Sequence, residues 1–383
     1  MIPLDFRGKP KNVQASIIGR VTSKWRQPLA DHVLLVRQNA PAQDVEGYAA
    51  VLTESPASAM ADAVLPVVSD LDLSRIADED VVRIDSRGHV RLLYRRQSAH
   101  NFLFATDRCN SLCLMCSQPP REVDDRGQVQ ELFRTVRLIS PETQELGITG
   151  GEPTLLKDGF LEVVKACRDH LPRTALHVLS NGRLFYHGSF ARALADISHP
   201  DIMVGVPLYA DNAVAHDHVV QARGAFDETV VGLQNLGRFG VPVEIRVVLH
   251  ALTWRRLPEL AEFIYRNFTF ASHVALMGLE QIGFAITNRN TLWIDPIDYS
   301  AELQAATLFL ADRGMTVSIY NHQLCTVPQP LWQFCRKSIS DWKNEYLPVC
   351  AACGVRERCG GFFASVIKRR ISRSVSAVAN PAM

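Results

Sequence analysis

From about residue 99 onward, short apolar runs alternate with longer segments of helical periodicity. The runs cover residues 101–106, 145–150, 175–181, 201–209, 243–251 and 273–280. A strand buried on both faces is continuously apolar, and strands that alternate with helices are typical of a parallel sheet or barrel. The pattern predicts the α/β class, with six βα units, a helical segment at 296–315 and one more strand at 316–320.

The start and the end of the chain differ from this pattern. Residues 1 to about 98 contain β-like runs at 15–21, 32–38 and 49–54 and a hairpin at 81–96 in which Gly88 can supply the turn. Five cysteines lie in the last 60 residues. We therefore predict a β-rich accessory domain at 1–98, a barrel domain at 99–315 and a cysteine-rich domain at 316–383.

Two helices are predicted from the spacing of apolar residues. Phe160, Val163, Val164 and Cys167 recur at one helical face, so Cys167 is interpreted as a core residue and not as a ligand. In the segment 224–240, Phe226, Val230 and Leu233 share a face, and Gly240 offers a stop.

Composition excludes several classes of protein. The net charge is only +1, so the chain as a whole lacks the strongly basic character typical of nucleic-acid-binding proteins. Residues 367–374 are locally basic. We find no run of about 18 apolar residues that could span a membrane, and the first residues lack the apolar core of a secretion signal. The prediction is a cytoplasmic protein that binds neither membrane nor nucleic acid. Cytosolic thiols stay reduced, so its clustered cysteines favour metal binding over disulfides.

Three cysteines, Cys109, Cys113 and Cys116, follow the first apolar run, and the next cysteine is the core residue Cys167. In βα folds, ligands bind at the carboxyl ends of the strands. Thiolates hold iron–sulfur clusters, and a four-iron cluster held by three thiolates leaves one iron open to a small molecule. The other strand ends carry short polar motifs and one arginine: "GGEP" at 150–153, "SNG" at 180–182, and Arg246 on the fifth strand.

The CxxxCxxC loop after a first strand, followed about 35 residues later by GGEP, resembles the radical S-adenosylmethionine (radical SAM) superfamily. The resemblance implies a partial (β/α)6 barrel. It also implies that Cys109, Cys113 and Cys116 hold a [4Fe-4S] cluster whose open iron binds S-adenosylmethionine. Reduction of the cluster would cleave this cofactor to methionine and a 5′-deoxyadenosyl radical.

The resemblance also assigns cofactor contacts. In the motif that ends in Pro153, Gly150 and Gly151 would allow close backbone approach, and Glu152 or its neighbouring carbonyls would accept from the methionine ammonium. Ser180 and Asn181 would suit the ribose hydroxyls, and Arg246 the methionine carboxylate. The position before the third cysteine is usually aromatic in the family, whereas this sequence has Met115, whose thioether can contact the adenine ring.

A second cysteine group, Cys350, Cys353 and Cys359, reads CxxC followed by a cysteine six positions later. Behind a radical SAM barrel it is similar to an auxiliary-cluster extension of the SPASM or twitch type. Cys325 is the favoured fourth ligand of a second [4Fe-4S] cluster. Cys335 competes with it, but it lies in a segment, 330–339, that reads as an amphipathic helix with Trp332 and Ile339 beside a buried side. Structural zinc is the alternative occupant.

Four strings of the sequence resemble the C-type radical SAM maturase of the His-Xaa-Ser system. They are "CLMCSQPP" (113–120), "HDHVVQARGAFDETVVGLQNL" (216–236), "SISDWKNEY" (338–346) and "RCGGFFAS" (358–365). The resemblance implies a ribosomally made peptide substrate with His-Xaa-Ser repeats and a paired second radical SAM maturase. It also implies an electron donor of the flavodoxin or ferredoxin type. No general acid or base can be named from these residues.

Other functions stay open in the sequence. A radical SAM enzyme that acts on a small molecule or on another protein is the main alternative, and a zinc-stapled binding protein is the alternative outside enzymes. His216 and His218 resemble a metal pair, but a role at the rim of the active site is favoured for them. The sequence has no HExxH motif and no phosphate-binding GxxxxGK[ST] loop.

Overall fold

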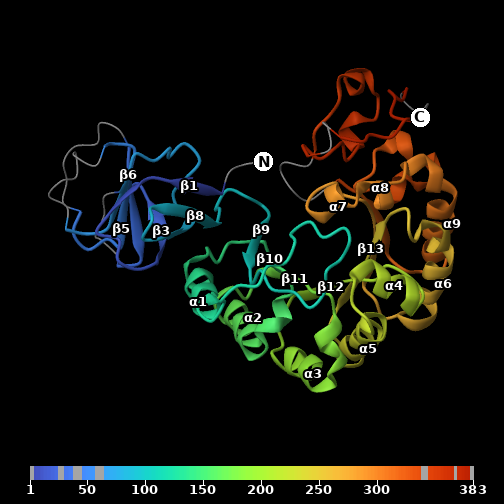
Figure 1. The fold of residues 1–383 in the computed structure, drawn as a ribbon, viewed down its shortest axis with the longest axis horizontal. Coiled ribbons are helices and arrows are strands. Elements are labelled where there is room, and N and C mark those ends of the chain that lie inside the picture. The colour runs from blue at the N-terminus through green and yellow to red at the C-terminus, as the bar shows by residue number, and fades with distance from the viewer. Residues whose placement is uncertain are drawn as a thin grey trace. The chain divides into compact units, whose positions relative to one another are not determined.

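The computed structural model describes residues 4–24, 30–37, 45–56, 64–337, 344–365 and 369–379. Two predicted features lie partly outside these residues. They are the string at 338–346, of which 338–343 are not described, and the basic segment at 367–374, of which 367 and 368 are not described. The chain divides into two units (Figure 1). The first comprises Met1–Phe104, Asp125–Gly147 and Glu162–Leu176, and the second comprises Ala105–Asp124, Ile148–Leu161 and His177–Met383. The predicted boundaries at 98 and 315 stay predictions.

The β-rich start of the chain forms an eight-stranded sheet in the order β1-β8-β7-β3-β4-β5-β6-β2. The predicted runs and the predicted hairpin are confirmed as strands. At the hairpin turn, Gly88 has a φ of +78°, which a glycine adopts without strain. The strands are β1 Asp5–Arg7, β2 Lys9–Lys11, β3 Ile17–Thr22, β4 His32–Val36, β5 Ala50–Thr53, β6 Val67–Ser69, β7 Val81–Ile84 and β8 His89–Tyr94.

The two strands at the ends of this sheet order, β1 and β2, are neighbours in the sequence and are separated only by Gly8. β1 pairs with β8 and β2 pairs with β6, both antiparallel. The Gly8 amide donates to the Gly88 carbonyl at 3.0 Å. Residues 5–11 thus act as one bent strand that joins both edges, so the sheet closes on itself and leaves no long edge for further strand pairing.

The interior of the closed sheet is apolar. β4 pairs in parallel with β3 and β5, and four of its five residues are buried. Burial on both faces explains why β4 reads as a continuous apolar run in the sequence. The buried cluster inside consists of Val13, Val21, Val33, Leu35, Ala50, Leu52, Val68, Leu71, Leu73, Ile76, Val82, Ile84, Val90 and Leu92.

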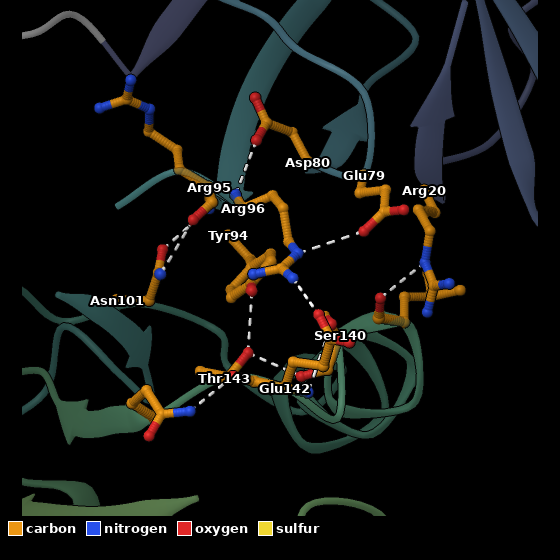
Figure 2. A network of polar contacts seen from close by, with 12 residues as sticks. Arg20, Glu79, Asp80, Tyr94, Arg95, Arg96, Asn101, Ser140, Glu142 and Thr143 are labelled. Carbon is orange, nitrogen blue, oxygen red and sulfur yellow. Dashed lines mark hydrogen bonds and ion pairs between the residues drawn. The ribbon is translucent and has the colours of Figure 1, made fainter. Parts of the chain in front are cut away.

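A network of polar contacts within the first unit joins the sheet to the end of helix α1 (Gln128–Leu138) and to the segment that follows it (Figure 2). Arg20 Nε donates to the Leu138 carbonyl at 2.9 Å, and the Tyr94 hydroxyl lies 2.8 Å from Thr143 Oγ1. These bonds explain why residues 125–147 belong to the same unit as the β-rich start. The other labelled members are Glu79, Asp80, Arg95, Arg96, Asn101, Ser140 and Glu142.

The second sheet has seven strands, and they follow one another in chain order from β9 to β15. Strands β12 to β15 pair in parallel, and helices separate successive strands. This sequential order confirms the α/β class and is that of a partial barrel. The strands are β9 Asn101–Phe104, β10 Glu145–Thr149, β11 Ala175–Leu179, β12 Ile202–Pro207, β13 Val243–Leu249, β14 His273–Gly278 and β15 Val317–Tyr320.

The longer helices lie where the periodicity predicts them. In α2 (Asp158–His170), Cys167 is 1 % exposed, which confirms it as a core residue. In α5 (Ala225–Arg238), Leu233 is buried as predicted, but Phe226 and Val230 are only half-buried. The buried face of α5 consists of Ala225, Thr229, Gly232, Leu233 and Leu236. The remaining helices are α3 Gly188–Asp196, α4 Ala213–Val220, α6 Leu257–Asn267, α7 Phe284–Thr287, α8 Arg289–Leu292 and α9 Ser300–Ala311.

The cysteine-rich end contains short 3-10 helices: η6 Leu324–Thr326, η7 Gln329–Phe334, η8 Pro348–Ala352 and η9 Arg356–Arg358. The predicted amphipathic helix over 330–339 is wrong. Helix η7 ends at Phe334 because the chain becomes extended at Cys335 and bridges to Ile319 of β15, where the Arg336 amide donates to the Ile319 carbonyl. Ile339 lies outside the described residues. Of the helices described, none has the length and apolar character required to cross a membrane.

Closure of the first sheet gives a prediction about Gly8. A Cβ at this position would lie 2.4 Å from the Ser69 carbonyl oxygen, so Gly8→Ala forces the two joined edges apart. We expect the free energy of unfolding, measured by urea titration, to fall by about 1–3 kcal/mol. Gly127→Ala is the control, because a Cβ there meets nothing within 4 Å. It should change the free energy by less than about 1 kcal/mol, and equal effects of the two substitutions would contradict the proposed closure.

Candidate active site at the strand ends

The three clustered cysteines lie in the loop that follows β9 and has no regular secondary structure. The end of α4 holds this loop by two backbone bonds, from the Leu112 amide to the Val220 carbonyl at 3.0 Å and from the Leu114 amide to the Val219 carbonyl at 2.9 Å. These bonds flank Cys113 on both sides. The cysteines are therefore carried on a backbone of fixed path.

The three thiols lie within electrostatic range of one another in a partly buried place. Burial, with a smaller contribution from the neighbouring thiols, raises the pKa of Cys109 to about 11 and that of Cys113 to about 12. Burial also raises the pKa of Cys116. Without a bound cation the three groups are therefore neutral thiols, and metal binding must release their protons.

Over the described ranges, no three His, Cys, Asp or Glu side chains converge closely enough to hold a single metal ion. A four-iron cluster makes a different demand, because each thiolate binds its own iron at a separate corner of the cluster. The all-thiol set of Cys109, Cys113 and Cys116, with no fourth cysteine in its loop, fits such a cluster with one iron left open.

Glycines line the loop on two sides. The Gly151 amide donates to the Thr106 carbonyl at 2.7 Å, and a Cβ on Gly151 would lie 2.2 Å from the Arg108 carbonyl oxygen. On the other side a Cβ on Gly283 would lie 2.3 Å from the Cys116 carbonyl oxygen. From the sequence, we expected Gly150 and Gly151 to allow a ligand to come close to the backbone. Their close approach here is to the backbone of the cysteine loop itself, and Gly283 was missed altogether.

Glu152 is fully buried and joins the ends of two strands. Its Oε1 accepts from the Thr154 amide at 3.0 Å, the Thr154 hydroxyl at 2.6 Å and the Ser180 hydroxyl at 2.8 Å, while Oε2 accepts from the Asn181 amide at 2.6 Å. Burial raises its pKa, against the effect of these bonds. The side chain is thus occupied by donors of this chain, so the neighbouring carbonyls are the better candidates for a ligand ammonium. Pro153 is buried and begins the 3-10 helix η2, Pro153–Leu156.

Beyond β11, Asn181 faces the cysteine loop, whereas Ser180 is turned toward Glu152. Asn181 Nδ2 donates to Asn110 Oδ1 at 2.6 Å. Sequence reasoning missed Arg183, two residues later, which donates to the Asn110 carbonyl, to Ser111 Oγ at 3.0 Å and to Glu228 Oε2 at 2.6 Å. Its guanidinium opposes the rise in the pKa of Cys109 and Cys113. The sequence did offer a sign of this role, because Arg183 directly follows the strand-end motif at 180–182. A positive charge at that place suits a group of cysteine thiolates.

Met115 and Tyr209 occupy the apolar side of the site. Met115 is 7 % exposed and belongs to one buried cluster with Tyr209, Val219 and Leu292. Tyr209 lies just beyond β12. Burial raises its pKa, the three thiols add to this rise, and Arg246 opposes it. Tyr209 is therefore a residue of the site that sequence reasoning missed, because its strand end carries no polar motif.

Arg246 lies on β13 and is paired with Glu244 on the same strand. Glu244 also accepts from His273 Nδ1 at 2.8 Å, and His177 Nε2 lies 3.7 Å from its other oxygen. Burial raises the pKa of Glu244, but the bond from His273 and the charges of Arg246 and His177 outweigh it and lower the pKa to about 2. Glu244 is thus a stable anion that holds Arg246, whose side chain keeps 25 % exposure.

The second cysteine group surrounds a pocket. Cys325, Cys350, Cys353 and Cys359 all line it, whereas Cys335 is not among its lining residues. Cys335 packs beside Cys359 in the adjoining apolar cluster, and burial raises its pKa to about 12. This arrangement favours the choice of Cys325 over Cys335 as the fourth ligand.

Backbone amides point at the sulfurs of this pocket. Cys359 Sγ accepts from the amides of Leu324 and Gly361, both at 3.5 Å, and Cys353 Sγ accepts from the amide of Val378 at 3.5 Å. Hydrogen bonds to sulfur stabilise thiolate ligands and tune the clusters that they hold. Four thiols in one pocket with such donors fit a four-iron cluster, in which each thiolate binds its own iron. As these side chains are placed, no three of them converge on a single zinc ion.

His216 and His218 do not form a pair. They lie on α4, where His216 is buried and His218 is exposed. His216 Nδ1 accepts from the Tyr209 amide at 3.3 Å, and burial lowers the pKa of His216 to about 4. The residue between them, Asp217, accepts from the amides of Gly224 and Phe226 at the start of α5. The HDH motif thus serves the packing of α4 and α5 beside the site.

The contacts of Arg183 give a test of how the cysteine loop is held. Arg183→Gln removes a charged donor that is only 13 % exposed and that bonds the loop at two places. We expect the free energy of unfolding of the metal-free protein to fall by about 1.5–3 kcal/mol. Arg192→Gln is the control, because Arg192 is 67 % exposed and makes one i,i+4 pair with Asp196. It should cost less than about 0.5 kcal/mol, and a similar loss in both variants would refute the account of the loop.

Comparison with known proteins identifies the domain that carries this site. Residues 103–264 match the family model described as the Radical SAM superfamily. A GTP 3′,8-cyclase of Petrotoga mobilis is 28 % identical over 152 residues, which are 38 % of this chain and 45 % of that protein. A GTP 3′,8-cyclase of Actinobacillus pleuropneumoniae serotype 7 is 40 % identical over 75 residues, which are 18 % of this chain and 22 % of that protein. The matches thus span less than half the length of these curated relatives.

Among solved structures, Streptococcus suis SuiB bound to S-adenosylmethionine matches with a TM-score of 0.49 and 16 % identity. The match covers 62 % of this chain and 53 % of that chain. The cysteine loop, the GGEP segment and β11 to β13 all lie inside the range that the family model matches. The part of the chain that carries this site is thus the part that matches the Radical SAM superfamily model.

Proposed function

We propose that this chain is a radical SAM enzyme in which Cys109, Cys113 and Cys116 hold a [4Fe-4S] cluster that binds S-adenosylmethionine. The observation that carries the proposal is the set of three thiols, within electrostatic range of one another, on a loop whose backbone bonds to the GGEP segment. Once reduced, such a cluster supplies the electron that cleaves S-adenosylmethionine to methionine and a 5′-deoxyadenosyl radical.

The chain's own residues have distinct tasks in this proposal. Asn181, Arg246 and the carbonyls of the GGEP segment orient the cofactor, with Glu244 fixing the position of Arg246. Ser180 acts through Glu152, to which it is bonded, and holds the ends of β10 and β11 together. Met115 and Tyr209 form an apolar wall that keeps water away from the reacting atoms.

We further propose an auxiliary [4Fe-4S] cluster on Cys325, Cys350, Cys353 and Cys359. Their shared pocket and the amides that point at two of the sulfurs support this assignment. Structural zinc stays the alternative occupant, and a cluster would differ from it in colour and in iron content.

The proposed substrate is a ribosomally made peptide with His-Xaa-Ser repeats, modified together with a paired second radical SAM maturase. An electron donor of the flavodoxin or ferredoxin type would reduce the cluster. This part of the proposal rests on the resemblance of the sequence strings at 113–120, 216–236, 338–346 and 358–365 to that maturase. The first, second and fourth of these lie at the cysteine loop, on α4 and α5, and at Cys359. The similarity to GTP 3′,8-cyclases makes GTP the second candidate substrate.

The nine cysteines provide a matched set of variants. The anaerobically reconstituted protein should be brown, contain roughly eight irons and form 5′-deoxyadenosine from S-adenosylmethionine after reduction with dithionite. Cys109→Ala should lose about four irons and all 5′-deoxyadenosine, and Cys325→Ala should lose only the second set of about four. Cys167→Ala and Cys335→Ala should keep both sets. A colourless protein with bound zinc, or a Cys109→Ala variant that still forms 5′-deoxyadenosine, would overturn the assignment.

The substrate is tested by offering the reduced, reconstituted protein a His-Xaa-Ser repeat peptide with its paired maturase, or GTP. We expect a change in peptide mass in step with 5′-deoxyadenosine formation and no consumption of GTP. The Cys109→Ala protein is the control that should leave the peptide unchanged. Consumption of GTP with an unchanged peptide would favour the second candidate instead.

A further inference from the structure

The last described segment of the chain, residues 369–379, borders the four-cysteine pocket. Ser376 lines the pocket, and the Val378 amide donates to Cys353 Sγ at 3.5 Å. In return the Gly354 amide donates to the Val378 carbonyl at 2.8 Å. Burial raises the pKa of Cys325, and a hydrogen bond from the backbone of Ser376 opposes this rise. One short segment thus supplies donors to two of the four sulfurs.

The same segment is fixed to the rest of the second unit at Asp295, a carboxylate that is 3 % exposed. Its Oδ2 accepts from the Arg373 amide at 2.9 Å and from Arg373 Nη1 at 3.2 Å, and its Oδ1 accepts from the Ser372 hydroxyl. Arg373 also pairs with Asp298 at 3.0 Å. A buried carboxylate is costly unless it is paired, so these contacts form a strong anchor three residues before Ser376.

A second set of contacts holds the start of the segment. Gln281 Nε2 donates to the Arg370 carbonyl at 2.8 Å. The Arg370 guanidinium lies over the Trp293 ring, 5.4 Å from its centroid, and donates to Asn290 Oδ1 at 2.9 Å. The segment is therefore held at Arg370, at 372–373 and at Val378. Its path across the pocket is determined by side chains that are not themselves ligands.

We propose that residues 370–378 are a positioning strap for the auxiliary cluster, with Arg373 and Asp295 as the positioning residues that hold the Ser376 and Val378 amides on the sulfurs of Cys325 and Cys353. This inference rests on the proposed function, because it assumes that the pocket holds a cluster. The strap stabilises the two thiolates by hydrogen bonding and covers the group that they bind.

The test compares Arg373→Gln with Arg369→Gln. Both variants remove one arginine charge from the same segment, but only Arg373 makes the contacts with Asp295 and Asp298. Iron release from the reconstituted protein to a strong iron chelator is followed anaerobically, and the phase that belongs to the auxiliary cluster is the one absent from Cys325→Ala. In Arg373→Gln this phase should be about two- to fivefold faster, because the Arg373 side chain is 64 % exposed and solvent screens its ion pairs. The other phase should keep the wild-type rate.

A spectroscopic readout separates positioning from general loss of stability. The paramagnetic resonance signal of the reduced auxiliary cluster should change in Arg373→Gln and recover in part in Arg373→Lys, while the signal that responds to S-adenosylmethionine stays unchanged. Ser372→Ala provides a second variant and should show a change in the same direction.

Equal release rates and unchanged signals in Arg373→Gln and Arg369→Gln would overturn the strap while leaving the proposed function intact. A wild-type protein that binds only roughly four irons would instead overturn the auxiliary cluster, and the strap with it.

Discussion

The candidate site depends on one steric constraint: the backbone of the cysteine loop lies against glycines on two sides. Carbonyl oxygens of Thr106 and Arg108 occupy the space that a side chain on Gly150 or Gly151 would need, and the Cys116 carbonyl does the same at Gly283. The backbone bonds at Gly151, Glu152 and Phe284 form because the chains can come this close. The path of the loop, and with it the position of the three thiols, follows from these approaches.

Electrostatic interactions are the second constraint on the site. Three partly buried thiols resist ionisation, and each thiolate makes the next less favourable. The proposed iron cluster would compensate this cost, and Arg183 adds one fixed positive charge that also bonds the loop. Fully buried Glu152 joins the ends of β10 and β11 at the same place. Each of these charged groups would be costly to bury alone, and each is stabilised by its charged or hydrogen-bonding partners in the site.

Much of the architecture can be predicted from the sequence. The strands were predictable because buried parallel strands read as apolar runs, and Cys167 could be set aside because its helical stripe is apolar. The three proposed cysteine ligands are close together in the sequence, so their spacing alone leads to the proposal. The match of residues 103–264 to the Radical SAM superfamily model agrees with that interpretation.

The rest depends on contacts between distant residues. The neighbours of Gly151 and Gly283 are carbonyls far away in the sequence, so spacing alone could not assign these glycines to loop packing. Tyr209 lies at a strand end without a polar motif and was missed for that reason. The segment at 330–339 has helical periodicity, but pairing of Cys335 with Ile319 outweighs it and ends the helix at Phe334.

The central claim is that the three cysteines hold a cluster whose fourth iron is left to the cofactor. Anomalous X-ray diffraction at the iron absorption edge, from anaerobic crystals of the reconstituted protein with S-adenosylmethionine, tests it most directly. The account predicts iron density bounded by Cys109, Cys113 and Cys116, with the amino and carboxylate groups of S-adenosylmethionine on the remaining iron. A fourth protein ligand on that iron, or a single metal ion in place of the cluster, would contradict it.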